Sequence, residues 1–221
     1  MIHWVPIPGE KFVMYSPVGL RPVDEFTARP PIGEVRATLE IADQGQYRHT
    51  DIEAVITPSS FLIYPGLGLS RDPKNAQPRK YRVSIDTEFY FPLYSATQGG
   101  TAAGIEFLAF PYDSTTPPAQ PPLVADLALL PAPNYPFQGA YPVIRGIVEL
   151  QGGARVKGAR VWLAQKERVI SGDRGAYSIA LRNVLSTAKI HANDDQNHVG
   201  SVDVDVADPN SRDICQRITI Q

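Results

Sequence analysis

The chain has 221 residues, of which 43% are hydrophobic and 20% charged, and its formal net charge at pH 7 is -2. This composition is typical of a folded globular protein and excludes a disordered, low-complexity chain. A chain with so little net charge lacks the basic character of nucleic-acid-binding proteins, so we expect no nucleic-acid partner. The 21 prolines and 17 glycines favour many turns between short strands over a helical fold.

The N-terminal residues Met1-Ile-His-Trp-Val-Pro-Ile-Pro-Gly9 have neither the basic region nor the long apolar run of a secretory signal. No later apolar run is long enough to cross a bilayer. We therefore expect cytoplasmic synthesis without a signal peptide and no membrane insertion. If the chain leaves the cell, we expect it to do so as part of a virion or another extracellular particle.

Residues 1–29 are predicted to be an irregular N-terminal arm. Their four prolines lie too close together for a helix and are unfavourable in a central strand. The arm carries Trp4, Phe12 and Tyr15, which are candidate interaction residues. They either pack back on the arm's own domain or dock on a neighbouring molecule.

The clearest pattern lies between Val143 and Leu181. Short apolar-alternating runs at 143–150, 156–163 and 172–181 are separated by glycine-containing breaks, as in consecutive antiparallel strands. Gly158 lets the chain enter the second run without a side chain in the way. Asp173-Arg-Gly175, directly before Ala176-Tyr177, predicts a tight turn.

The pattern Val-Ile-Arg-Gly146-Ile-Val, followed by Val156-Lys-Gly-Ala-Arg-Val and then by a glycine turn and Tyr177, resembles the carboxypeptidase regulatory-like family. The resemblance implies a transthyretin-like β-sandwich over residues 143–221. Members of that family are mostly accessory modules without chemistry of their own.

A degraded copy of the same pattern covers residues 30–130. Gly33 stands where Gly158 stands, and Ser60 replaces the turn glycine. The matched runs are 31–39 with 156–163, 57–67 with 171–181, 80–90 with 187–193, and 123–130 with 213–220. We therefore predict an all-β chain of two tandem transthyretin-like, Greek-key, immunoglobulin-like β-sandwiches.

Residues 131–142 are the predicted linker between the two domains, stiffened by four prolines. Tyr135, Phe137 and Tyr141 in this linker are candidate interaction residues, expected to fill the groove between the domains. A second proline-rich segment, 111–122, is either a crossover within the first sandwich or a recognition strip.

The sequence offers little for catalysis. It has no His-Glu-x-x-His, no Gly-x-Ser-x-Gly and no glycine-rich phosphate loop. Hydroxyisourate hydrolases, which share this kind of sandwich, end in Tyr-Arg-Gly-Ser, whereas this chain ends Ile218-Thr-Ile-Gln221. Intradiol dioxygenases use a closely spaced histidine pair, and His191 and His198 are not spaced in that way. We predict a non-enzyme without a cofactor.

Two further features concern ligands and reactivity. Asp194, Asp195, Asp203 and Asp205 offer hard oxygen atoms to a cation such as calcium, or simply form a solvated loop and an outward strand face. The single cysteine, Cys215, excludes an internal disulfide, and its Val/Ile-rich surroundings predict a buried thiol.

The fold is therefore the main functional clue. Stiffly linked sandwiches with aromatic loops suit a structural or adaptor protein whose partners are other protein subunits, such as a component of a bacteriophage tail or contractile particle. A homo-oligomer is compatible with this role. The alternative is a soluble carbohydrate- or protein-binding module, and tightly bound iron or zinc would instead favour an enzyme.

Overall fold

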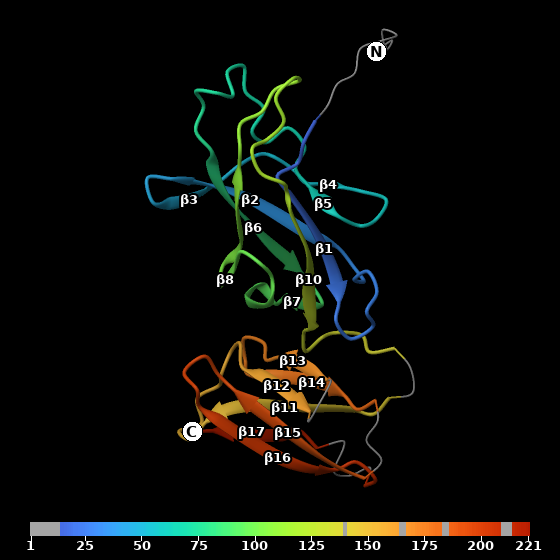
Figure 1. Ribbon diagram of the computed structural model, residues 1–221. Helices are drawn as coiled ribbons and strands as arrows, with labels where there is room; N and C mark the ends of the chain where they lie inside the picture. The colour runs from blue at the N-terminus through green and yellow to red at the C-terminus, as the bar shows by residue number, and fades with distance from the viewer. Residues whose placement is uncertain (1–13, 139–140, 164–166, 183–185, 209–213) are drawn as a thin grey trace. The chain divides into compact units, whose positions relative to one another are not determined.

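The computed structural model describes residues 14–138, 141–163, 167–182, 186–208 and 214–221 (Figure 1). Regular structure in these residues is β throughout, apart from one short 3-10 helix, η1 (Tyr94–Ala96). The prediction of an all-β chain is confirmed. Trp4 and Phe12 lie outside the described residues.

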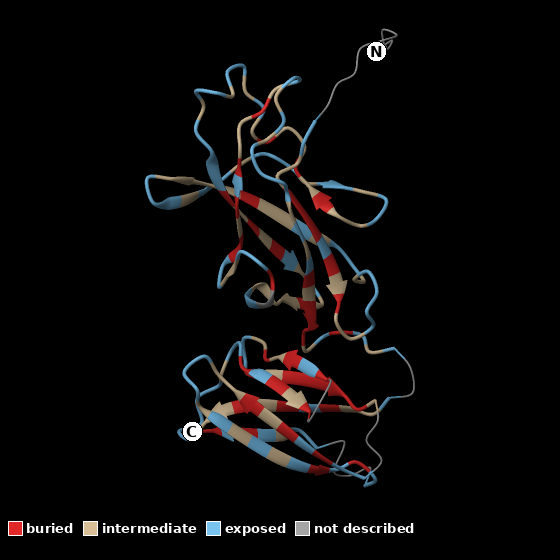
Figure 2. Cartoon of the chain, in the orientation of Figure 1, coloured by how far each residue is buried: buried red, intermediate tan, exposed pale blue. Residues whose placement is uncertain are grey.

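Strands between residues 18 and 131 form two five-stranded sheets, ordered β4-β5-β1-β10-β7 and β3-β2-β6-β9-β8. Buried side chains alternate with half-buried ones along strands such as β6, where Tyr81, Val83 and Ile85 are buried (Figure 2). Each sheet therefore turns an apolar face inward. The strands are β1 (Val18–Asp24), β2 (Val35–Asp43), β3 (Gln46–His49), β4 (Val55–Ile56), β5 (Leu62–Ile63), β6 (Arg79–Thr87), β7 (Tyr90–Pro92), β8 (Gly100–Thr101), β9 (Gly104–Ala109) and β10 (Leu123–Pro131).

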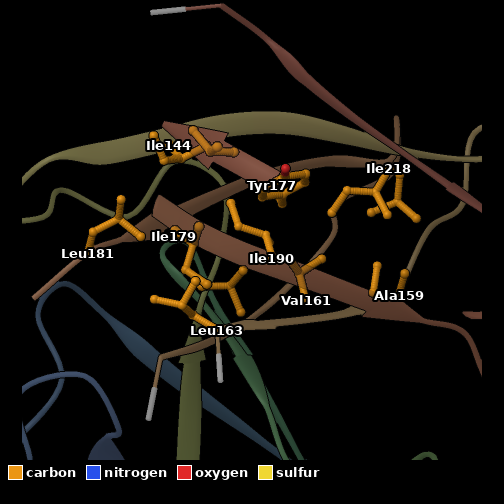
Figure 3. Close-up of a cluster of buried hydrophobic side chains, with 14 of the residues drawn as sticks. Ile144, Ala159, Val161, Leu163, Tyr177, Ile179, Leu181, Ile190 and Ile218 are labelled. Carbon is orange, nitrogen blue, oxygen red and sulfur yellow. The ribbon is translucent and has the colours of Figure 1, made fainter. Parts of the chain in front are cut away.

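Strands between residues 143 and 220 form a three-stranded sheet, β14-β11-β17, and a four-stranded sheet, β13-β12-β15-β16. One buried cluster takes side chains from both sheets, including Ile144 and Ile179 from the first and Val161 and Ile190 from the second (Figure 3). These two sheets thus enclose a sandwich core. The strands are β11 (Val143–Leu150), β12 (Arg160–Leu163), β13 (Arg168–Ile170), β14 (Ala176–Ala180), β15 (Thr187–Asn193), β16 (Val199–Asp205) and β17 (Gln216–Ile220).

Gly146 occupies the centre of β11, where its two neighbouring strands approach closely. A Cβ atom at this position would lie 2.2 Å from the carbonyl oxygen of Gln216 in β17 and 2.4 Å from the Tyr177 ring in β14. The contact with Gln216 is impossible unless the backbone of β17 moves, and the contact with Tyr177 requires its ring to shift. The glycine in the first apolar run is therefore required by packing on both sides.

The two halves of the chain share one strand order. The run β5-β1-β10 in the first half has the same order as β14-β11-β17 in the second, and β3-β2-β6-β9 has the same order as β13-β12-β15-β16. The pairs β1–β5 and β11–β14 are both antiparallel, as are β6–β9 and β15–β16. In the described residues of the first half, β4, β7 and β8 are additional to this common set.

Residues 18–24, which the sequence analysis expects to be part of an irregular arm, form β1 between β5 and β10. Pro22 does not prevent this, because β5 pairs only with Gly19 and Leu20. The missing amide of Pro22 therefore falls beyond the β5 ladder. The segment is a central strand with Val18 and Leu20 almost completely buried.

The chain divides into two compact units that are not contiguous in sequence. The first contains Pro22 and the described residues before it, together with 37–85 and 94–127. The second contains 23–36, 86–93 and the described residues from 128 onward.

Candidate interaction site

The first unit carries a largely apolar groove between β9, the start of β10 and the proline-rich segment 117–122, called here the loop-end groove. It consists of two adjoining cavities of about 480 and 620 Å³. Both are lined by Pro17, Leu108, Phe110, Pro121 and Pro122. Stretches that are far apart in sequence therefore meet at this surface.

Several large apolar side chains at the loop-end groove are open to solvent. Met14, Leu108 and Val124 are exposed by 53%, 47% and 60%. The charged side chain in the lining, Glu106, is already ion-paired with Lys80 at 2.6 Å. Apolar surface gathered in this way is typical of a surface that contacts another molecule.

Tyr15, a predicted interaction residue, lines this groove and is held in a fixed position. Its ring meets the Tyr112 ring edge-on, with centroids 5.1 Å apart. The Tyr15 amide donates to the Tyr112 hydroxyl at 3.2 Å, and that hydroxyl donates to the Tyr15 carbonyl at 3.3 Å. Because Tyr112 is completely buried, it anchors Tyr15, whose side chain remains 37% exposed.

The proline-rich segment 111–122 joins β9 to β10, and its second half forms one wall of the groove. In its first half, the Asp113 carboxylate stabilises a turn by accepting hydrogen bonds from the amides of Thr115 and Thr116 at 2.8 and 2.7 Å. These backbone hydrogen bonds lower the pKa of Asp113. The segment is thus both a connection between strands and part of the exposed surface.

The other predicted aromatic residues lie in the second unit, around Phe26. Ring centroids of Tyr135, Phe137 and Tyr141 lie 5.9, 5.1 and 6.3 Å from that of Phe26, all edge-on. The Arg182 guanidinium lies 4.3 Å from the centre of the same ring. Phe26, which the sequence analysis does not single out, is therefore the centre of this cluster.

Asp24 is the buried carboxylate beside this aromatic cluster, and it is only 1% exposed. It accepts hydrogen bonds from the hydroxyls of Tyr135 at 2.7 Å, Thr27 at 2.8 Å and Tyr90 at 3.3 Å. Burial, and then the contact with Asp24, raise the pKa of Tyr135. Burial raises the pKa of Tyr90 to about 12. The side chains of this group are internally satisfied, which is typical of a structural role.

The four candidate cation ligands do not converge. Asp194 accepts the amides of Gln196 and His198, both at 2.9 Å, and contacts the His198 ring nitrogen Nδ1 at 2.8 Å. The hydrogen bond from the His198 side chain is the main reason why the pKa of Asp194 is lowered. Asp194 therefore holds the turn between β15 and β16.

Asp203 and Asp205 lie further along β16 on its exposed face, opposite Lys189 and Thr187 of β15. Asp195 is exposed in the turn. Within the described residues, no three histidine, cysteine or acidic side chains are grouped closely enough to hold a metal ion.

Cys215 is exposed, so the prediction of a buried thiol is wrong. It precedes β17, which begins at Gln216, and the inward-facing apolar positions of that strand are Ile218 and Ile220. The apolar run around Cys215 therefore reflects strand residues that follow it, together with Ile214, which is itself 61% exposed.

Comparison with models of known protein families and with curated proteins finds no match to the chain. In the part of the chain that the structure describes, no helix is long and apolar enough to cross a membrane.

Proposed function

We propose that the chain is a non-catalytic structural or adaptor subunit of a larger protein assembly, and that the assembly is a bacteriophage tail or a related contractile particle. The observation that carries the assembly role is the loop-end groove. It presents Met14, Leu108 and Val124 on a surface braced by prolines and by the Tyr15–Tyr112 contact. A surface that is already ordered loses little entropy when a partner docks.

We further propose that the chain consists of two tandem transthyretin-like sandwiches of the carboxypeptidase regulatory-like kind. The shared strand order supports a duplication, because all four sequence matches fall on strands in equivalent places. Gly33 and Gly158, matched in sequence, have φ angles of 75° and 76°. Ser60, which replaces the turn glycine Gly175, has a φ of 61° where the glycine has 68°.

The assembly role is tested by sedimenting a lysate of the source cells and locating the protein by mass spectrometry. We expect it to pellet with a particle of megadalton size and with fixed partner subunits. Recovery only in the light soluble fraction would contradict the proposal. Partners recovered with the pellet would show whether the particle is a phage tail.

A pair of matched variants tests whether the loop-end groove is the docking surface. Val124→Asp places a charge at the groove, whereas Val199→Asp changes a valine of similar exposure, 57%, on β16 of the second unit. We expect Val124→Asp to leave the particle fraction and Val199→Asp to remain in it. Equal incorporation of both variants would exclude the groove as the contact.

A further inference from the structure

A further cavity, of about 380 Å³, lies in the first unit and differs in character from the loop-end groove. It is formed where the segment 68–81 passes the end of β9, and its walls include Ser70, Gln77, Arg79 and Tyr81. Leu69, Pro78 and Pro111 supply its apolar part. The cavity, called here the Arg79 pocket, is within the size range of small-ligand sites.

The walls of the Arg79 pocket are fixed by backbone hydrogen bonds. The Tyr112 amide donates to the Gly68 carbonyl at 2.9 Å, and the Ser70 amide donates to the Tyr112 carbonyl at 2.8 Å. Gly68 has a φ of +92°, and a Cβ atom there would lie 2.4 Å from the Phe110 carbonyl oxygen. The two chain segments can approach this closely only because residue 68 is glycine.

Two strong hydrogen-bond donors at this pocket are unused. Tyr81 is 95% buried with its ring stacked on Phe107 at 5.8 Å, yet its hydroxyl makes no hydrogen bond with a described residue. Arg79 is exposed and has no ion-pair partner among the described residues. The Tyr81 hydroxyl is not one of the fully buried, unpartnered polar atoms of the described residues, so it reaches the surface, and both groups can donate to a bound molecule.

The charge around the Arg79 pocket is positive although the chain as a whole carries -2. No acidic side chain is in the lining. The neighbouring segment 70–79 contributes Arg71 and Lys74 in addition to Arg79, against one acid, Asp72. The Asp72 carboxylate accepts from the Asn75 amide at 2.7 Å, within its own turn. The pocket therefore favours an anionic ligand.

We infer that the Arg79 pocket binds a sugar acid, a monosaccharide unit that carries a carboxylate. An arginine fork matches a carboxylate with two parallel hydrogen bonds. The Tyr81 hydroxyl and the Gln77 amide are suited to sugar hydroxyls, and the proline and leucine surfaces to the C–H face of the ring. This inference rests on the pocket alone and does not depend on the assembly proposal.

The test is calorimetric titration of the full chain with D-glucuronate and D-galacturonate, against D-glucose, D-galactose and inorganic phosphate. Arg79→Gln removes the charge, and Tyr81→Phe removes only the hydroxyl and keeps the stacked ring. The control is Arg145→Gln, because Arg145 is also exposed and unpaired among the described residues but lies on β11. Circular dichroism checks that each variant is folded.

We expect saturable binding of at least one of the two acids, weakened about tenfold or more by Arg79→Gln. Tyr81→Phe should weaken it about threefold to tenfold, while Arg145→Gln leaves it unchanged. Equal binding of the neutral sugars would overturn the inference. So would displacement of the acid by phosphate at equal affinity, or the absence of uronate binding by the parent protein.

Discussion

Buried tyrosine hydroxyls divide into those with a partner and those without one. Tyr135 and Tyr90 both donate to Asp24. Tyr64 is completely buried in the first unit, and its hydroxyl has no partner. Burial alone raises the pKa of Tyr64 to about 12. Its hydroxyl therefore costs desolvation at every pH and resists ionisation while the chain is folded.

Tyr64 predicts a specific loss of stability in alkali. The pKa of Tyr64 is about 12 in the folded chain and 10.0 ordinarily, so unfolding makes the hydroxyl easier to ionise. Ionisation therefore does not affect the unfolding free energy below pH 10, and it lowers the unfolding free energy as the pH rises from 10 toward 12. Between pH 8 and pH 11 the parent should lose about 1 kcal/mol of unfolding free energy more than Tyr64→Phe. Urea unfolding at the two pH values measures this. Equal losses in both proteins would contradict it.

At the residue scale, the sequence indicates some of the aromatic residues around Asp24 and Phe26 but not the residues that they contact. The sequence predicts contacts for Tyr135 and Phe137, because aromatic residues in a stiff segment need an apolar surface to pack against. Phe26 and Asp24 carried no comparable signal, since Asp24 is 111 positions from Tyr135. A lone acidic residue in an apparently irregular arm gives no indication of burial.

At the scale of strands, period-two alternation and the glycines between the runs predict part of the second half. They predicted the runs that became β11, β12 and β14. The same reasoning missed β1, because Pro17 and Pro22 flank or interrupt it and suggest irregular chain. The strand accommodates Pro22 because β5 pairs only with Gly19 and Leu20, so no hydrogen bond to β5 is needed at residue 22. Which residues of a strand are paired cannot be read from alternation.

The glycine of β11 gives a prediction at this scale. Gly146→Ala places a Cβ atom within 2.2 Å of the Gln216 carbonyl oxygen, so β17 must move away from β11. We expect the unfolding free energy to fall by at least about 2 kcal/mol. Gly152→Ala is the matched control, because nothing lies within 4 Å of its Cβ position. Chemical denaturation of both variants measures the difference, and similar effects would show that the β11–β17 approach is not tight.

At the scale of the whole molecule, sequence order and spatial grouping diverge. The sequence predicts consecutive domains, whereas the second compact unit contains 23–36 and 86–93 together with the described residues from 128 onward. The loop-end groove likewise combines residues near 15, 108 and 121. Composition and periodicity describe contiguous windows, so neither a discontinuous unit nor a surface shared by distant loops could be predicted from them.

The second sandwich nevertheless has a core of its own, which predicts that it folds alone. Every residue of its buried cluster lies between Ile144 and Ile220. A fragment of residues 141–221 loses the ion pair between Arg168 and Glu25. The Arg168 side chain is exposed, so this ion pair stabilises the fold by at most about 1 kcal/mol. The fragment also loses the hydrogen bond from Ser178 to the Pro133 carbonyl, the hydrogen bond from Arg182 to the Phe26 carbonyl, and the packing of Arg182 on the Phe26 ring.

We therefore expect the 141–221 fragment to show strand-type circular dichroism and a single cooperative urea transition, at lower denaturant than the same part of the full chain. Trp162 reports on the transition, since the other tryptophan, Trp4, is absent from the fragment. Ile190→Ala, which opens a cavity at a completely buried site, should lower the fragment's unfolding free energy by about 2–5 kcal/mol. A broad, non-cooperative transition in the unmodified fragment would show that residues 23–36, 86–93 or 128–140 are needed to complete its core.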